Sequence, residues 1–461
     1  MINKKNISEI IKTALSTGGD FAEIFLEDKD ELRINYKRNK VTAITTSRIK
    51  GVGIYILLGS RSVYLHTNDL SQSSLLETAK VGAEFLANKQ SSNKLNNINF
   101  NCSKSINPNP IKTLPSLIAH NKKIDILKEI TDYSYKIDKR VINMDSTYFD
   151  NDQKIAIYNS EGLHAVDRRI NSKIRLGATV GQEGSYYDEW EDFTKAKGFE
   201  AFENNEEYLD FAHSFITSLV GNIDAVPFES CRVPVVFEGG NCGTFWHETC
   251  GHQLESYAIA RNSSDFEGLI GQKVASDKVT LVDDGTIAGL YGSAAIDDEG
   301  NPTKRNVLIE KGILKGYLVD RLGGRLLNMP STSSGRRQGY TFAPTSRMTN
   351  TYLQAGEDCE DEMISSVEKG VFVKKLGGGT GGREFSIAVK EGYLIEEGRI
   401  TKRLKGLILN GRGIELIKKV DRVGKKLVTE DGSFCGASSG LCPVTSFQPR
   451  MRISNMFVGG K

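Results

Sequence analysis

The sequence is short of proline, of tryptophan and of net charge. It contains 10 Pro and 2 Trp among 461 residues, whereas 46 residues are Gly. Because average usage is ~5% Pro and ~7% Gly, this imbalance favours strands joined by glycine turns over a Pro-rich scaffold. The 60 Lys and Arg residues nearly balance the 58 Asp and Glu residues and leave a formal charge of +2. Duplex-binding surfaces usually carry excess basic charge, so no nucleic-acid partner is expected.

Long apolar runs and a regular cysteine pattern are also absent. The longest apolar stretch, Val52 to Leu58, is much shorter than the ~20 residues of a membrane helix, so we expect no membrane span. Apolar residues near the amino terminus recur at helical spacing and form no continuous secretion core, which predicts a cytoplasmic protein. The seven Cys are odd in number and irregularly spread, which favours free thiols or metal ligation over a disulfide framework.

Hydrophobic periodicity divides the chain into three regions. Residues 1–90 combine helical patterns with alternating apolar runs and predict an α/β module. A polar stretch from Lys89 to Pro110 precedes a middle α+β module, residues 111–221. Residues 229–461 predict a large mixed domain that contains antiparallel sheets. The predicted fold class is therefore α+β.

Two of the six His residues flank an acidic residue in Phe245-Trp-His-Glu-Thr-Cys-Gly-His-Gln-Leu-Glu255. In the zinc-binding motif H-E-x-x-H, the two His are four residues apart and share one helical face. His247 and His252 are five apart, and a regular helix would separate them by roughly 140°. A π-type bulge absorbs one extra residue. We therefore predict a bulge across Thr249 to Gly251 that brings both imidazoles to one ion; the alternative is two His placed on a helix by chance.

A catalytic zinc ion needs a third protein ligand and leaves one position open for water. Cys435 lies in a glycine-bracketed loop, Asp431 to Gly440, that can hold a thiolate close to a metal. Glu255 is three residues beyond His252 and can either bind the ion or orient that imidazole. Residue chemistry alone leaves the choice of third ligand open among Cys250, Glu255, Cys435 and Cys442.

Further blocks of the final region complete a family pattern. They are Gly292-Ser-Ala-Ala-Ile-Asp-Asp-Glu-Gly-Asn-Pro-Thr303, Ile309-Glu-Lys-Gly-Ile-Leu-Lys-Gly-Tyr317 and Arg347-Met-Thr-Asn-Thr-Tyr352. With the His247 motif and the Cys435-Gly loop, they resemble the TldD/PmbA family of metallopeptidases, specifically its metal-bearing TldD branch. The first region resembles the family more loosely. Residues Ala437 to Pro443 depart from the family's usual Lys, Gln and Val-Pro arrangement and introduce Cys442.

The resemblance implies a carboxy-terminal metal domain in which His247, His252 and Cys435 bind Zn²⁺ and Glu248 is the acid-base residue. It implies a zinc-dependent peptidase that hydrolyses short or unstructured peptides. It also implies a dimer, either a homodimer or a heterodimer with a PmbA-like paralogue. A different interpretation is a non-catalytic binding or regulatory subunit of a TldD/PmbA-type complex, in line with the family's older association with DNA gyrase modulation.

The residues allow a specific mechanism for the peptidase. Zinc lowers the pKa of its bound water toward ~7, and Glu248 takes the proton of that water before passing it to the leaving amine. An extended peptide can bind an exposed strand through main-chain hydrogen bonds, which predicts a sheet-lined cleft. The glycine-rich run Leu376 to Gly382 lacks a P-loop ending, so we expect a flexible loop beside that cleft. Candidate groups for binding the substrate are Arg336, Arg337, Tyr340, Arg347 and Tyr352.

Overall fold

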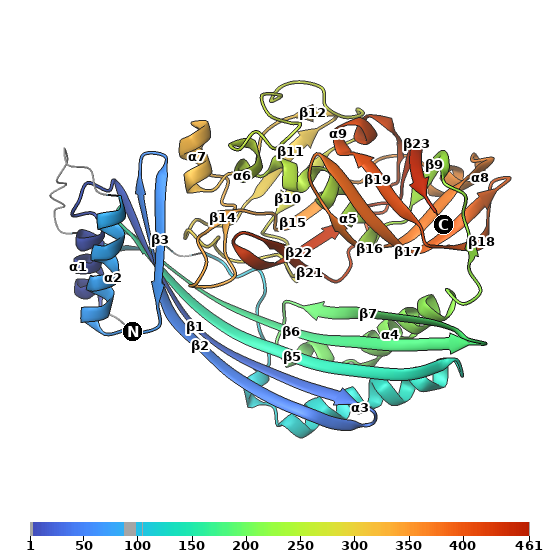
Figure 1. The fold of residues 1–461 in the computed structure, drawn as a ribbon, viewed down its shortest axis with the longest axis horizontal. Helices are drawn as coiled ribbons and strands as arrows, with labels where there is room; N and C mark the ends of the chain where they lie inside the picture. Colours follow the sequence, from blue (N-terminus) through green and yellow to red (C-terminus); the bar gives the residue numbers. More distant parts are fainter. Residues whose placement is uncertain (1–2, 87–97, 104, 461) are drawn as a thin grey trace.

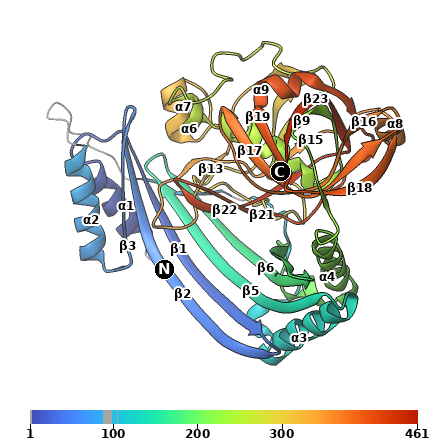
Figure 2. The same cartoon turned by 45° about the vertical axis from the view of Figure 1, so that its right-hand side comes forward.

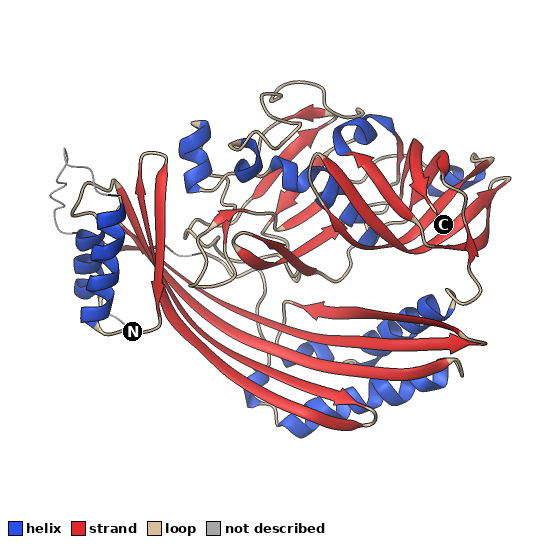
Figure 3. Cartoon of the chain, viewed as in Figure 1, coloured by secondary structure: helices blue, strands red, loops and turns tan. Residues whose placement is uncertain are grey.

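The computed structural model describes residues 3–86, 98–103 and 105–460. Much of the predicted polar boundary, residues 89–97 and 104, lies outside the described residues, as do residues 87–90 at the end of the first predicted region. A long curved sheet with helices at both ends lies beside a strand-rich carboxy-terminal part (Figure 1). Helices and strands occur in both parts (Figure 3), which confirms the α+β class.

The curved sheet has seven strands, in the order β3-β2-β1-β5-β6-β4 with β7 also paired to β6. The antiparallel pairing of β1 with β5 runs from Glu23↔Asn159 to Lys37↔Asp145, so the first two predicted regions share one sheet. The strands are β1 (Phe21–Lys37), β2 (Lys40–Leu58), β3 (Arg61–Thr67), β4 (Asn101–Ser103), β5 (Val141–Asn159), β6 (Leu163–Gln182) and β7 (Ser185–Lys195).

Helices cover the two ends of this sheet and create two separate cores (Figure 2). At one end α1 (Lys4–Ala14) and α2 (Gln72–Phe85) pack apolar residues such as Ile10 and Leu75 against β1 and β2. At the other end α3 (His120–Ile137) and α4 (Asn205–Val220) cover β5 and β6. Each of the four helices buries one apolar stripe, which is the pattern of an amphipathic helix. Two 3₁₀ turns, η1 (Pro115–Leu117) and η2 (Phe199–Phe202), complete this part.

The carboxy-terminal part is built around an eight-stranded sheet in the order β16-β9-β23-β19-β17-β18-β8, with β20 on β23. An additional pairing of β16 with β17 closes the strands β16, β9, β23, β19 and β17 into a ring. The strands are β8 (Val226–Pro227), β9 (Cys231–Phe237), β16 (Lys369–Thr380), β17 (Glu384–Glu396), β18 (Arg399–Lys405), β19 (Ile408–Arg412), β20 (Val420–Val423) and β23 (Met451–Gly459).

A six-stranded sheet, in the order β12-β11-β10-β15-β22-β21, lies beside this ring. Its strands are β10 (Leu281–Asp284), β11 (Arg305–Glu310), β12 (Ile313–Leu314), β15 (Asn350–Leu353), β21 (Ser433–Ala437) and β22 (Gly440–Phe447), and β13 (Gly335–Arg336) pairs with β14 (Thr345–Ser346) separately. The short helices are η3 (Gly240–Gly243), α5 (Thr244–Trp246), η4 (His247–Gly251), η5 (His252–Leu254), α6 (Ser256–Ile259), α7 (Arg321–Leu327), α8 (Glu360–Ser365), α9 (Gly413–Leu416) and η6 (Ile417–Lys419). None of the helices in the described ranges is long and apolar enough to cross a membrane.

A buried charged group joins the curved sheet to the carboxy-terminal part. We call it the interface cluster, and it comprises Glu23, Arg169, Asp297, Asp298 and Arg337. Arg337 pairs with Glu23 at 2.5 Å, and Arg169 pairs with Asp298 at 2.6 Å. The main-chain N–H of Arg337 also donates to Asp298. These contacts hold the two parts together through paired charges, which a low-dielectric interior tolerates only when they are matched.

Candidate metal centre

The predicted helical bulge is present and places both His side chains on one side of the helix. Residues His247–Gly251 form a π-helical turn, in which the main-chain N–H of His252 donates to the carbonyl oxygen of His247. The hydroxyl of Thr249 donates to the carbonyl of Phe245 at 2.6 Å. The widened turn absorbs the extra residue between the two His, so their ring centroids lie 4.8 Å apart.

Gly251 allows a close approach at this turn. A Cβ atom at Gly251 would lie 2.0 Å from the sulfur of Met348, which packs directly against the turn. Met348 is in turn fixed through its carbonyl oxygen, which accepts a hydrogen bond from Arg336 at 2.5 Å. The local sequence therefore allows the bulge, and tertiary packing holds it in place.

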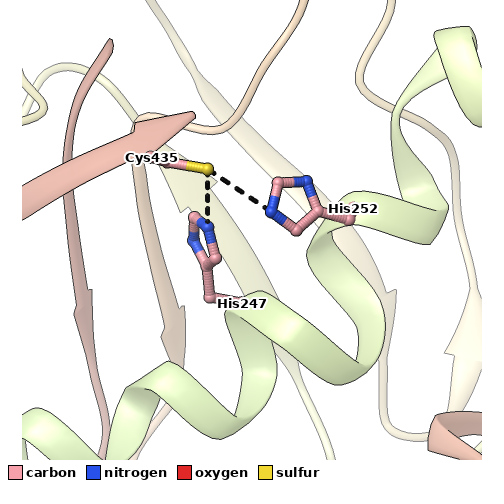
Figure 4. Close-up of side chains that lie close together, drawn as sticks. All are labelled: His247, His252 and Cys435. Atoms are coloured by element: carbon pink, nitrogen blue, oxygen red, sulfur yellow. Dashed lines mark hydrogen bonds between the residues drawn. The ribbon is translucent and has the colours of Figure 1, made fainter. Parts of the chain in front are cut away.

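Three potential ligand atoms converge beside this turn. The side chains of His247, His252 and Cys435 point toward one another (Figure 4), with Cys435 supplied by β21. The sulfur of Cys435 lies 3.2 Å from Nε2 of His247 and 3.4 Å from Nε2 of His252. All three atoms lie within 4.8 Å of one another, and no other such metal-ligating group is found in the described part of the chain. Cys250 and Cys442 do not belong to this group.

The donor set fits a zinc ion. A tetrahedral ion with Zn–N bonds of ~2.0–2.1 Å and Zn–S bonds of ~2.3 Å separates its nitrogen and sulfur donors by about 3.5 Å. The two nitrogen–sulfur distances are close to this value. Two imidazoles and a thiolate, with one side open to a cleft, provide the three protein ligands and the free position of a catalytic site.

Electrostatics favour the metal-binding form of Cys435. Burial disfavours its thiolate, but the adjacent His247 and His252 rings outweigh burial and lower the pKa of the thiol to about 4. Burial also disfavours the charged form of His252, but Glu255 and Cys435 outweigh it and raise the pKa of this imidazole. In contrast, burial raises the pKa of Cys250 to about 12. Since the thiolate is the form that binds metals, Cys435 is prepared as a ligand and Cys250 is not.

Polar side chains contact the far nitrogen of each imidazole. The carboxylate oxygens of Glu255 lie 3.4 and 3.5 Å from Nδ1 of His252, and Oγ of Ser446 lies 3.4 Å from Nδ1 of His247. Such contacts fix the orientation of metal-binding His rings. Glu248 lies on the open side instead: its carboxylate is 4.0 Å from Nε2 of His252 and lines the cleft.

A cleft of about 1220 Å³ opens onto these residues, between β7 and α4 on one wall and the carboxy-terminal part on the other. Lys375 pairs with Glu191 across it, and Lys195 pairs with Asp431 at 2.7 Å. The cleft also contains Trp190, which sequence reasoning missed. Its side chain is 54% exposed. Sequence reasoning missed Trp190 because the alternation of its strand does not indicate which face meets another part of the molecule.

Residues 376–380 of the glycine-rich run belong to β16, so the predicted loop is wrong for this part, whereas the predicted position beside the cleft is confirmed. The strand β16 extends to Thr380, with register shifts that interrupt its pairing to β17 and turn residues 377–382 toward the cleft. A Cβ atom at Gly381 would lie 2.7 Å from the carbonyl oxygen of Glu248 and 2.9 Å from Cδ2 of His252. The absence of a side chain at Gly381, directly after β16, thus lets the chain lie on the site.

The predicted substrate-binding arginines Arg336 and Arg337 are buried, and neither lines the cleft. Arg337 pairs with Glu23 in the interface cluster, and its guanidinium lies 4.4 Å from the ring centroid of Phe25. Arg336 donates to the carbonyl of Met348. Sequence reasoning had no signal for the partners of these two residues.

Tyr340 and Tyr352 also lie away from the cleft. The main-chain N–H of Tyr340 donates to Glu27 at 2.8 Å, and its carbonyl accepts from the hydroxyl of Tyr64 at 2.7 Å. The ring of Tyr352 stacks on Phe447 with 4.7 Å between centroids. A role of these tyrosines in substrate binding stays a prediction that their positions do not support.

Arg347, the fifth of these residues, contacts the metal centre from behind. Its guanidinium donates to the carbonyl oxygen of Cys435 at 2.5 Å and to that of Gly440 at 3.0 Å. Its Nε lies 3.8 Å from Glu255. Arg347 thus links the strand that supplies Cys435 to the carboxylate beside His252.

Models of three consecutive family domains match the chain. The PmbA/TldA metallopeptidase domain 1 matches residues 22–84, the central domain matches residues 115–220, and the C-terminal domain matches residues 230–460. The chain belongs to the PmbA/TldD family of metallopeptidases.

Curated relatives and solved structures agree with this assignment. A Metalloprotease TldD homolog of Haemophilus influenzae is 32% identical over 434 residues, which cover 89% of this chain and 87% of the relative. A Zinc metalloprotease TldD homolog of Saccharolobus solfataricus is 23% identical and covers 98% of this chain and 99% of its own. TldE from Thermococcus kodakarensis shares the fold, with a TM-score of 0.74, 17% identity, and coverage of 99% of this chain and 100% of that chain.

Proposed function

We propose that this metallopeptidase is a zinc-dependent peptidase in which His247, His252 and Cys435 hold the ion and Glu248 is the acid-base residue. The observation that carries the proposal is the convergence of the three donor atoms within 4.8 Å at the floor of a cleft. The name of the Saccharolobus solfataricus relative, a zinc metalloprotease, supports the choice of metal. The bound zinc would supply a Lewis acid that polarises the scissile carbonyl and lowers the pKa of the attacking water.

The protein's own side chains have distinct roles in this mechanism. Glu248 faces the cleft beside His252, where its carboxylate can take a proton from the attacking water and return it to the leaving amine. Glu255 and Ser446 hold the two imidazoles in their orientations. Arg347 holds the main chain of Cys435 and therefore acts as a positioning residue in this scheme.

The substrates we propose are short or unstructured peptides bound in extended form. Within the described sheets β21 pairs only with β22, so one edge of the strand that carries Cys435 has no partner strand. Residues 433–437 line the cleft. A peptide that added to this edge would place its main chain beside the metal ligands, and main-chain pairing would make little demand on its side chains.

The assembly and location of the protein are part of the proposal. We infer a cytoplasmic dimer, formed by two copies or with a PmbA-like paralogue. The structural similarity to TldE keeps a non-catalytic subunit of such a complex as the second candidate. The His-His-Cys convergence favours the catalytic role, because a purely regulatory subunit has no use for three aligned donors and a cleft-facing carboxylate.

One comparison tests the catalytic role. Wild type, Glu248→Ala and the exposed control Glu229→Ala are purified, their zinc is measured by mass spectrometry, and cleavage of unstructured peptides is followed. We expect zinc in all three and a loss of about 10²–10⁴-fold in kcat for Glu248→Ala alone. Equal cleavage by wild type and Glu248→Ala would refute the acid-base role of Glu248, and no cleavage by the zinc-loaded wild type would favour the regulatory subunit.

A further inference from the structure

Cys442 is a buried thiol that the proposed metal site does not use. It lies directly opposite Cys435 in the antiparallel register of β21 and β22. Directly opposite residues have their Cα atoms about 4.5–5.5 Å apart and point to the same face of the sheet. Disulfides span Cα separations of about 4.4–6.8 Å, so the two strands already provide the backbone spacing of a disulfide.

The two thiols differ in access. Cys435 lines the cleft, whereas Cys442 does not line it and is 1% exposed. A small oxidant in the cleft therefore meets Cys435 first, and Cys442 lies opposite Cys435 on the neighbouring strand. None of the other five cysteines, all within the described residues, lies opposite a cysteine in the strand registers.

A guanidinium connects the pair. Nη1 of Arg347 lies 3.9 Å from the sulfur of Cys442, while Nη2 donates to the carbonyl oxygen of Cys435. This group contacts both cysteines and therefore holds the two strands of the hairpin in place at this pair.

We propose that Cys435 and Cys442 form a redox modification site, at which a hydroperoxide converts the two thiols into a disulfide and removes Cys435 from the metal ligand set. The Cys435 thiolate attacks one peroxide oxygen; the O–O bond breaks, a sulfenic acid forms, and the departing hydroxide takes up the proton that the thiol had released. The Cys442 sulfur then attacks the Cys435 sulfur; the S–S bond forms, the S–O bond breaks, and water leaves. The two sulfurs lose two electrons, which reduce one hydrogen peroxide to two waters.

The consequence for the metal rests on the proposed function. A sulfur engaged in a disulfide is no longer the thiolate that zinc requires, so oxidation leaves two protein ligands, one fewer than a catalytic zinc site needs. Thiol reductants convert a disulfide back into two thiols. They do not reduce the sulfinic acid that a cysteine without a partner thiol forms on further oxidation. Cys442 therefore makes oxidation at Cys435 reversible.

The test treats the purified full-length protein, zinc-loaded and zinc-free, with hydrogen peroxide. We expect a Cys435–Cys442 disulfide by peptide mapping in both forms, release of one zinc per disulfide into a colorimetric chelator, and rebinding after dithiothreitol and zinc. Cys442→Ser should bind zinc normally, then lose it irreversibly as Cys435 reaches the sulfinic acid. The matched buried control Cys250→Ser should behave as wild type.

Two results would overturn the site. In the first, Cys435 of the wild type is oxidised but the Cys442 thiol still reacts with an alkylating reagent after denaturation. In the second, the oxidised Cys442→Ser variant recovers zinc binding after reduction as fully as the wild type does. Mapping on wild type does not depend on how any variant folds, and it reads the disulfide directly. A mapped disulfide in a protein that neither binds zinc nor cleaves peptides would refute the proposed function and leave the dithiol site standing.

Discussion

The metal centre and the interface cluster are both buried polar groups, but different forces assemble them. At the metal centre, residues 188 positions apart in sequence, His247 and Cys435, meet beside a π-helical turn that close packing enforces. In the interface cluster, charges from the curved sheet and the carboxy-terminal part neutralise one another, as in the pair of Arg337 with Glu23. The first group is open to a cleft and has donors available for a ligand, whereas the second does not line the cleft and pairs its arginines with carboxylates of the cluster. Buried charge by itself therefore does not mark a functional site; unpaired donors beside open space do.

The largest expected effect comes from removing an ion pair of the interface cluster, which should lower stability without changing metal binding. Arg337→Met leaves Glu23 buried without its partner, which we expect to cost about 3–5 kcal/mol of the free energy of unfolding. Zinc content per folded molecule should not change. Chemical denaturation and metal analysis measure the two effects. The double variant Glu23→Leu/Arg337→Met should recover most of the stability; a loss of zinc from the folded single variant would mean that the two groups are coupled.

Substitution of Glu255, which contacts the far nitrogen of His252, should weaken zinc binding and leave the interface cluster unchanged. Glu255→Gln weakens the contact to Nδ1 of His252, and we expect zinc affinity to fall about 10–100-fold, as is typical for such outer partners. The exposed control Glu267→Gln should keep wild-type affinity. Competition with a chelator gives the affinities. Unchanged zinc binding in Glu255→Gln would show that Glu255 does not orient the imidazole.

The interface cluster should respond to pH. Burial raises the pKa of Asp297 to about 7 from an ordinary value of 3.8. The folded protein thus holds this proton more tightly than the unfolded chain does, so the contribution to stability is full below pH 3.8 and is lost as pH rises to about 7. Between pH 3.8 and about 7, the unfolding free energy of the wild type should therefore fall as pH rises. Asp297→Asn should make this slope shallower, by at most about 1.4 kcal/mol per pH unit. Parallel curves for Asp297→Asn, wild type and the exposed control Asp277→Asn would contradict this.

The smallest expected effect concerns Gly381, which directly follows β16 and lies on the metal centre. Gly381→Ala would press a methyl group on the main chain of Glu248 and the ring of His252. We expect kcat to fall by about 10-fold, less than the ~10²-fold that a 1 Å misplacement can cost. Gly378→Ala, where nothing lies within 4 Å, is the control. Equal rates for the two variants would show that this segment does not constrain the site.

The local parts of the structure were predictable from the sequence. The four amphipathic helices follow from their apolar stripes, and the bulge follows from the five-residue spacing of His247 and His252. Cys435 as the third donor followed from the family resemblance, since residue chemistry left Cys442, Cys250 and Glu255 open. In each case the signal lies within a few residues or in a recognisable motif.

Contacts between distant segments could not be predicted in this way. Nothing in the alternation of β1 or β5 indicates that they pair, so the sheet shared by the first two regions was not expected. The burial of Arg337 depends on Glu23, which lies 314 residues away. Trp190 enters the cleft only because β7 lies against the carboxy-terminal part. These features depend on pairing partners that a single sequence does not encode locally.

The direct test of the central claim is anomalous diffraction at the zinc absorption edge from crystals of the zinc-loaded protein. The account predicts one strong peak at about 2.0–2.1 Å from Nε2 of His247 and of His252 and at about 2.3 Å from the sulfur of Cys435. A peak bound by Cys442 in place of Cys435, or no peak between the two imidazoles, would contradict it.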